Sequence, residues 1–272
     1  MGYLPHPDTS NLNSPSYRPA WLLAGLALFG IGFGFVEAVV VVDLRAILEP
    51  RTGPSGPLSV EHALFPFLAF DRLEQLDPAA ARLMRIEVLR EAATLVMLAG
   101  AGLAAGRSFM QRFSALLIAF GVWDICYYLS LRLLLGWPAT LWTWDVLFLI
   151  PVPWAAPVLA PGITATSMVV AGSAVLVWES TGCPFRVSRW DWAAIVAGGL
   201  ILMVAFCWDF RNIAAGGLPN PFPWPGFFVG QFIGLCGFLH AAWTNQVARS
   251  RSESRVATRG SASLAMAEAE RT

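Results

Sequence analysis

Long apolar runs, separated by short polar segments, recur along most of the chain. A helix needs about 20 mostly apolar residues to cross the hydrocarbon core of a bilayer, and several runs reach or approach that length. The clearest are Trp21–Val42, Ile86–Ala105, Phe113–Leu135, Trp190–Phe210 and Phe227–Gln246. These five runs predict transmembrane helices.

A sixth apolar stretch, Thr143–Trp178, is longer than one span requires and is rich in proline and tryptophan. Because proline lacks a backbone donor and clashes with the preceding turn, one straight helix is not expected. We predict a short interfacial or re-entrant piece at Trp142–Pro151, followed by a span from about Ala155 to Trp178. Two full spans here would raise the total to seven. The prolines that break the stretch are Pro151, Pro153, Pro157 and Pro161.

Composition supports a membrane protein. Hydrophobic residues make up 56% of the chain and charged residues only 13%, against about 25% charged in an average soluble domain; the mean hydropathy is +0.59. The formal net charge of +0 argues against a nucleic-acid partner. The expected fold class is all-α, a polytopic transmembrane helix bundle of about six spans. We divide the chain into a polar N-terminal tail (1–20), a transmembrane domain (21–246) and a mobile C-terminal tail (247–272).

Six spans would place both termini on the same side of the bilayer. Arginines are expected to favour the cytoplasmic side. The arginines predicted on the same side of the bilayer as the termini outnumber those predicted on the opposite side. The first group is Arg18, Arg107, Arg112, Arg186, Arg189, Arg249, Arg251, Arg255 and Arg259; the second is Arg45, Arg51, Arg72, Arg82, Arg85 and Arg211. Trp137, Trp142, Trp144, Trp154, Trp208 and Trp224 would then form an aromatic belt at the outer interface. We therefore expect cytoplasmic termini.

Charged residues lie inside the predicted spans, where each costs roughly 2.5–3.5 kcal/mol on insertion scales. Glu37 lies deep in the first run. In the second run, Glu87, Arg90, Glu91 and Thr94 follow the i, i+3, i+4, i+7 spacing of one helix face. The third run carries Asp124, Tyr127 and Tyr128, with Arg132 one turn further on, and Asp145 follows at the boundary. The candidate site residues are thus Glu37, Glu87, Arg90, Glu91, Asp124, Tyr127, Tyr128, Arg132 and Asp145.

Three interpretations of this polar set remain open. The first is a structural salt-bridge network, in which Arg90 pairs with Glu37 or Asp124 and fixes helix packing. The protein would then be a scaffold or an accessory subunit. The carboxylates outnumber the local arginines, however, and surplus intramembrane carboxylates favour protons or cations. The leading hypothesis is therefore binding or transport of a small polar solute or cation from the outer face.

The third interpretation is a membrane-embedded metal-dependent enzyme acting on a lipid-like substrate, with Glu87, Glu91 and Asp124 as candidate ligands. The Glu-x-x-His spacing of di-iron bundles is absent, and His6, His62 and His240 lie too far apart along the predicted topology to share one centre. P-loop, Gly-x-Ser-x-Gly and His-Glu-x-x-His motifs are also absent. The sequence therefore leaves any cofactor, any catalytic residue and the oligomeric state undetermined.

Small residues at Gly30, Gly34 and Ala38 recur at four-residue intervals beside Glu37. This small-xxx-small pattern lets two helix backbones approach closely. It predicts that this face of the first helix, and Glu37 with it, points into the bundle and away from lipid.

Three strings, REAATLVML (90–98), FGVWDICYY (120–128) and TWDVLFLIPVPW (143–154), resemble a group of uncharacterised multi-pass bacterial membrane proteins. The resemblance covers roughly Glu87–Pro161. It implies a bacterial inner membrane and no particular activity, ligand or cofactor.

Overall fold

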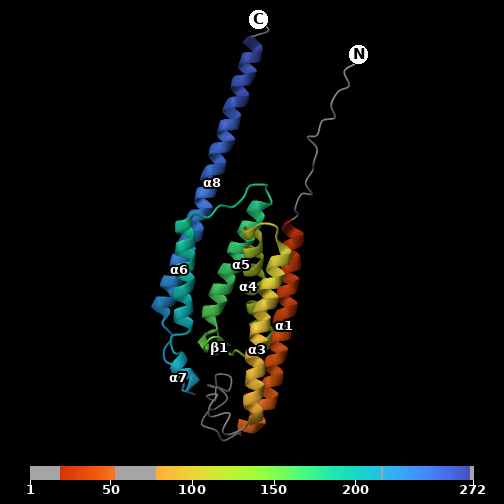
Figure 1. Ribbon diagram of the computed structural model, residues 1–272, viewed down its shortest axis with the longest axis vertical. Coiled ribbons are helices and arrows are strands. Elements are labelled where there is room, and N and C mark those ends of the chain that lie inside the picture. The colour runs from red at the N-terminus through yellow and green to blue at the C-terminus, as the bar shows by residue number, and fades with distance from the viewer. Residues whose placement is uncertain (1–18, 53–77, 216, 270–272) are drawn as a thin grey trace, which may run out of the picture.

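A bundle of long helices makes up most of the molecule in a computed structural model, which describes residues 19–52, 78–215 and 217–269 (Figure 1). The helices are α1 (Pro19–Thr52), α3 (Pro78–Ala105), α4 (Phe109–Leu135), α5 (Leu159–Glu179), α6 (Arg189–Phe206), α7 (Phe210–Ala214) and α8 (Trp224–Ala269). Two short strands, β1 (Trp144–Phe148) and β2 (Trp154–Pro157), precede α5. The predicted all-α bundle is confirmed.

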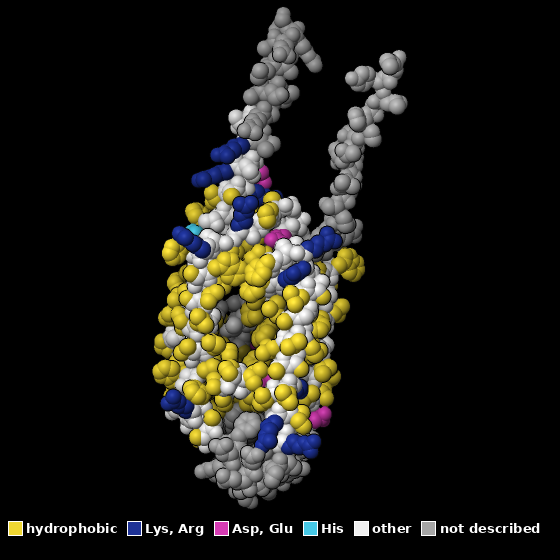
Figure 2. All heavy atoms as spheres, viewed as in Figure 1, with side chains coloured by type: hydrophobic (Ala, Val, Ile, Leu, Met, Phe, Trp, Pro, Cys, Tyr) yellow, Lys and Arg dark blue, Asp and Glu magenta, His cyan; other side chains and the backbone are white. Residues whose placement is uncertain are grey.

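Within the described residues, 6 helices are long and apolar enough to cross a membrane. Their membrane-competent segments are Pro19–Leu44, Arg85–Ala105, Phe109–Leu135, Leu159–Glu179, Arg189–Phe206 and Trp224–Arg255. On the face shown in Figure 2, hydrophobic side chains form a broad band across the middle of the bundle, and arginines gather near its two ends. The chain is therefore an integral, polytopic membrane protein.

The Pro/Trp-rich stretch forms a β-hairpin. β1 and β2 pair antiparallel, with Asp145 opposite Ala156, and the register shifts between Val146 and Phe148. The following span begins at Leu159 and not near Ala155 as expected, because Ala155 and Ala156 pair with β1. Pro161 lies in the first turn of α5, where a missing backbone donor costs nothing.

Close packing of α1 on α4 depends on the small-residue strip of α1. A Cβ added at Gly34 would lie 2.6 Å from the carbonyl oxygen of Trp123, and one added at Gly30 would lie 2.8 Å from the Val122 side chain. Ala38 is fully buried. The predicted role of this strip as a backbone contact is confirmed.

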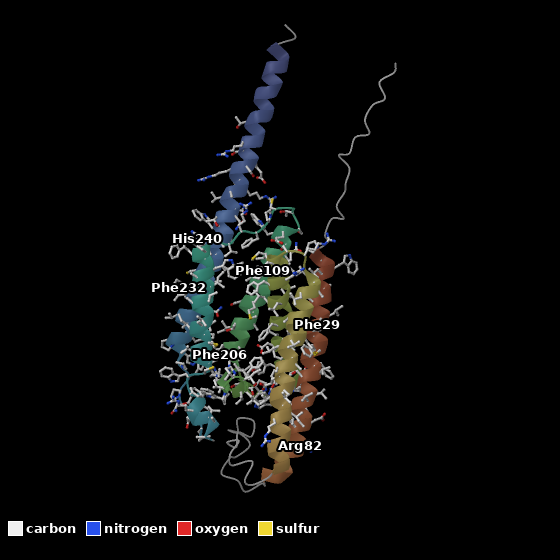
Figure 3. The ribbon with its side chains drawn as sticks, in the orientation of Figure 1. Phe29, Arg82, Phe109, Phe206, Phe232 and His240 are labelled. Carbon is white, nitrogen blue, oxygen red and sulfur yellow. The ribbon has the colours of Figure 1, made fainter. Side chains whose placement is uncertain are left out.

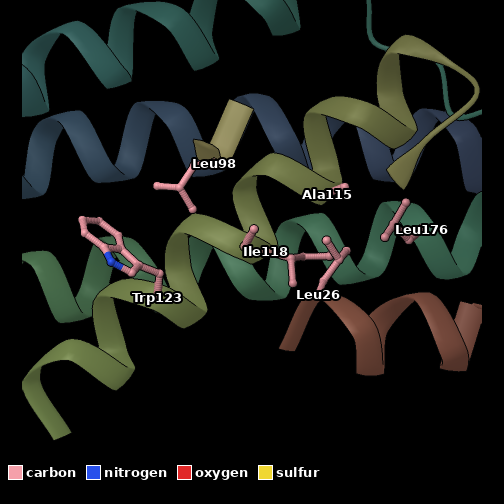
Figure 4. Close-up of a cluster of buried hydrophobic side chains, with 7 residues drawn as sticks. Leu26, Leu98, Ala115, Ile118, Trp123 and Leu176 are labelled. Carbon is pink, nitrogen blue, oxygen red and sulfur yellow. The ribbon is translucent and has the colours of Figure 1, made fainter. Parts of the chain in front are cut away.

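One apolar core joins four helices around α4. Leu26 of α1, Leu98 of α3 and Leu176 of α5 pack against Ala115, Ile118 and Trp123 of α4 (Figure 4). Through these contacts α4 holds α1, α3 and α5 together, and so sets the positions of the polar side chains further along the same helices.

The two ends of the bundle differ. The start of α1 and the end of α8 lie at one end, here called the terminal end, while the β-hairpin and α7 lie at the other, the hairpin end (Figure 1). Composition predicts a mobile tail after residue 246, whereas α8 continues as a helix to Ala269. The helix can continue because Ala, Arg and Glu are good helix formers and residues 248–269 contain no proline.

At the hairpin end, Asp209 organises the segment between α6 and α8. Its carboxylate accepts hydrogen bonds from the side-chain amide of Asn212 (2.9 Å) and from the backbone N–H and side-chain amide of Asn220 (both 2.8 Å). Burial alone would raise the pKa of Asp209, but these donors favour the charged form and hold its pKa below the usual value.

Candidate functional site

A small cavity of about 60 Å³ lies between α1, α3, α4 and the β-hairpin, toward the hairpin end. Its polar lining consists of Glu37, Glu87, Arg90, Glu91, Thr94, Asp124, Tyr127, Tyr128 and Asp145, and its other lining residues are Val41, Trp123, Val146, Leu147, Phe148 and Leu149. A cavity needs a volume of roughly 10–15 Å³, measured in the same way, to hold one water molecule. The cavity therefore has room for a few waters or a small ion, and not for a sugar or an amino acid.

Arg90 of α3 links two helices inside this cavity. Its guanidinium donates to both carboxylate oxygens of Glu87, with Nε at 2.9 Å from Oε2, and it also donates to Glu37 of α1. A longer bond of 3.3 Å runs from Nη1 to the Thr94 hydroxyl. The planar fork of arginine suits such bidentate pairing. The carboxylates of Glu37 and Glu87 thus share the single positive charge of Arg90.

The β-hairpin closes one wall of the cavity through two polar contacts. The backbone N–H of Leu149 donates to Glu91 (2.8 Å), and the Tyr128 hydroxyl donates to Asp145 (3.0 Å). Tyr127 packs edge-on against Tyr128, with ring centroids 5.0 Å apart. Asp145 is 3% exposed, so the hairpin carries its carboxylate into the interior.

Two carboxylates in the cavity lie outside the ion pairs that Arg90 forms. Neither Glu91 nor Asp124 forms an ion pair with any described residue, and Asp124 also lacks a hydrogen bond within that part of the chain. Asp145 adds further negative charge near Asp124. Because Arg90 offsets only one of the two charges on Glu37 and Glu87, the acidic side chains that line the cavity outnumber its one arginine.

Eight of the nine predicted site residues line this cavity. Arg132 does not: it is exposed, and its guanidinium donates to the carbonyl oxygens of Gly136 and Pro138 just beyond α4. Arg90 pairs with Glu37, one of its two predicted partners, and not with Asp124. Lysine and arginine near a helix end satisfy the last carbonyl groups, which explains the placement of Arg132.

The hairpin wall from Val146 to Leu149 is the part of the site that the sequence did not indicate. These residues are apolar, and Leu149 contributes its backbone N–H. No side-chain motif marks such a contact; the run of prolines indicates an irregular segment without showing where it folds.

The described part of the chain contains no group of three or more His, Cys, Asp or Glu side chains placed to hold a metal ion. The geometry therefore does not support a metal centre there. His6 and His62 lie outside the described residues. His240 of α8 lies near the terminal end, where its Nδ1 is 2.7 Å from Asp191 of α6 (Figure 3). That pair links two helices far from the cavity.

No family model, curated protein or solved structure matches the chain. The class of protein is therefore defined by the fold and the site alone: a helical membrane protein with six spans among the described residues and a small carboxylate-lined cavity.

Proposed function

We propose that the protein binds a small cation in this cavity and conducts or exchanges it across the membrane. The observation that carries the proposal is the presence of Glu91 and Asp124 in the cavity without an ion pair to a described residue. Buried carboxylates require protons or cations to offset their desolvation. A cation would supply that charge.

The chemistry of the lining favours a hard cation. Carboxylate and hydroxyl oxygens from Glu91, Asp124 and Tyr127 surround the space, and hard cations such as Na⁺ and Ca²⁺ prefer oxygen ligands. The volume of about 60 Å³ supports a bare or partly hydrated ion in preference to a larger polar solute. Protons are the smallest ligand of this class.

Cation binding can be tested by thermal unfolding of the purified protein in detergent with Na⁺, K⁺, Mg²⁺ or Ca²⁺, with a chloride salt of a bulky organic cation at equal ionic strength as reference. We expect one of these ions to raise the unfolding temperature, because it binds the folded state preferentially. Glu91→Gln and Asp124→Asn should each weaken apparent affinity by at least about tenfold, the equivalent of one lost charge contact of 1.4 kcal/mol.

Asp43→Asn serves as the control, because Asp43 is exposed on α1 outside the cavity lining. Transport is measured separately, as radiolabelled flux of the stabilising ion, or as a pH change, in proteoliposomes. If no ion stabilises the protein and the cavity variants conduct like the wild type, the charge cluster is only a structural clasp and the proposal fails.

A further inference from the structure

A second and larger cavity lies between the two halves of the bundle. It has a volume of about 270 Å³ and lies between α4 and α5 on one side and α6 and α8 on the other. Its lining is almost wholly apolar and includes Phe113, Trp192, Gly199, Leu202 and Phe238, with a polar contact from Gln231 to Ser167 (2.7 Å). Figure 2 shows a hollow in the apolar band beside α6. We call this space the apolar cleft.

The cleft exists because the two halves of the bundle meet mainly at their ends. At the terminal end, Phe113 of α4 contacts Trp192 of α6, with ring centroids 5.5 Å apart. Toward the hairpin end, Phe206, Phe222 and Phe227 pack with Ala160 of α5. Phe109 and Phe206, labelled in Figure 3, mark these two levels. Between them, Gly199 of α6 leaves its part of the cleft wall without a side chain.

The dimensions of the cleft match one bilayer leaflet. Its α6 wall runs from Trp192 to Leu202, which is about 15 Å at 1.5 Å per residue. That is about half of the roughly 30 Å hydrocarbon core. Apolar walls without partner atoms forfeit dispersion contacts, so hydrocarbon from the surrounding membrane would fill the space favourably.

Positive charge lies at the headgroup level beside the cleft. Arg107 and Arg112 flank the start of α4, and Arg186 and Arg189 flank the start of α6, the two helices whose aromatic side chains form its terminal edge. All four side chains are exposed, and none forms an ion pair with a described residue. Arginine pairs readily with phosphate, and basic side chains near the surface attract anionic lipids.

We propose that the apolar cleft binds one acyl chain of an anionic phospholipid from the terminal-end leaflet, with the phosphate held by these arginines. This site is separate from the carboxylate-lined cavity and does not depend on its function. The length of the cleft, its apolar lining and the positive charge at its mouth all favour this ligand.

Native mass spectrometry of the purified full-length protein, mixed with equal amounts of phosphatidylglycerol and phosphatidylcholine, tests this proposal. We expect one phospholipid to remain bound, with phosphatidylglycerol preferred roughly tenfold because one or two arginines contact its headgroup. Absence of bound lipid, or equal retention of the two lipids, would overturn the proposal.

Paired variants separate the acyl-chain contact from the headgroup contact. A Cβ added at Gly199 meets nothing within 4 Å, so Gly199→Phe fills the cleft and should abolish retention. Gly32 on α1 has equally open surroundings, and Gly32→Phe should retain the lipid. Loss of lipid from both variants, or from neither, contradicts the assignment.

Charge variants provide the second test and leave the cleft itself intact. Arg107→Gln with Arg189→Gln should reduce the preference for phosphatidylglycerol to about that for phosphatidylcholine. Arg251→Gln with Arg255→Gln, which removes equal charge from the exposed part of α8, should leave it unchanged. The same spectra report the oligomeric state. If the wild type is a lipid-free dimer and Gly199→Phe dissociates it, the cleft binds a second copy of the chain and the lipid proposal is rejected.

Discussion

At the scale of single residues, Arg90 and Arg132 have different roles although both lie toward the hairpin end. Arg90 is inside the polar cavity, bonded to Glu37, Glu87 and Thr94, and its side chain is 23% exposed. Arg132 lies at a helix end and bonds only to carbonyl oxygens among the described residues. Because Arg90 and its two carboxylate partners are largely buried, removing one of them should destabilise the protein far more than removing one member of an exposed ion pair.

We therefore expect Arg90→Gln to lower the free energy of unfolding by about 3 kcal/mol, because Glu37 and Glu87 would remain buried without a cation. Arg132→Gln should lower it by about 1 kcal/mol or less, since only hydrogen bonds to an exposed turn are lost. Unfolding in mixed detergent micelles measures both changes. Equal effects of the two substitutions would show that Arg90 contributes no more than a surface arginine.

At the scale of elements, the contact between α1 and α4 places Glu37 beside the cavity. Gly34 precedes Glu37 by nearly one turn, and its surface lies directly against the α4 backbone at Trp123 and Tyr127. Small residues allow this approach, and in lipid such close packing replaces the hydrophobic driving force that is lost between membrane helices. The position of Glu37 relative to Arg90 thus depends on a backbone contact elsewhere on the helix.

Gly34→Ala should destabilise the protein by about 1–3 kcal/mol, the usual cost of overpacking, because even a Cβ would lie 2.9 Å from the Tyr127 nitrogen. Gly32→Ala is the matched control: its Cβ would meet nothing within 4 Å. Thermal unfolding in detergent compares the two. Equal stability of both variants would indicate that α1 does not pack on α4 through this face.

At the scale of the whole molecule, the six spans found in the described segments form two groups, with the charged cavity inside one group and the apolar cleft between the two. α1, α3, α4 and α5 share the core around Leu98 and Ile118, and the first three of them line the charged cavity together with the β-hairpin. α6 and α8 approach each other at Gly198 and Gly230 and border the apolar cleft. The interior of one group thus suits a charged ligand, and the space between the two groups suits hydrocarbon, because of the side chains that line each.

Six spans and cytoplasmic termini predict a labelling pattern. In a variant whose cysteines, Cys126, Cys183, Cys207 and Cys236, are replaced by Ala, Thr140→Cys should react with an impermeant maleimide from outside the cell. Ser252→Cys should react only after permeabilisation, because it lies beyond the bundle at the terminal end. Labelling of both residues from outside would support seven spans, and labelling of Ser252→Cys alone would reverse the orientation.

Local pattern determined much of the architecture. The apolar runs predict the spans to within a few residues, since in a bilayer any long segment must satisfy its own backbone hydrogen bonds and so becomes a helix. Helical spacing likewise placed Glu87, Arg90, Glu91 and Thr94 on one face, and the glycine strip turned Glu37 inward.

The tertiary structure alone decided how those faces meet. It folded the Pro/Trp-rich segment into a hairpin, brought Asp145 and the Leu149 N–H to the cavity, turned Arg132 away, and left the apolar cleft between α4 and α6. The contact of Leu149 with Glu91 and the walls of the cleft join residues far apart in the chain, and the hairpin and the Arg132 bonds depend on irregular backbone; hydropathy and helical spacing report on neither. The sequence therefore determined which residues are polar within the membrane, and the packing of helices determined which of them share a cavity.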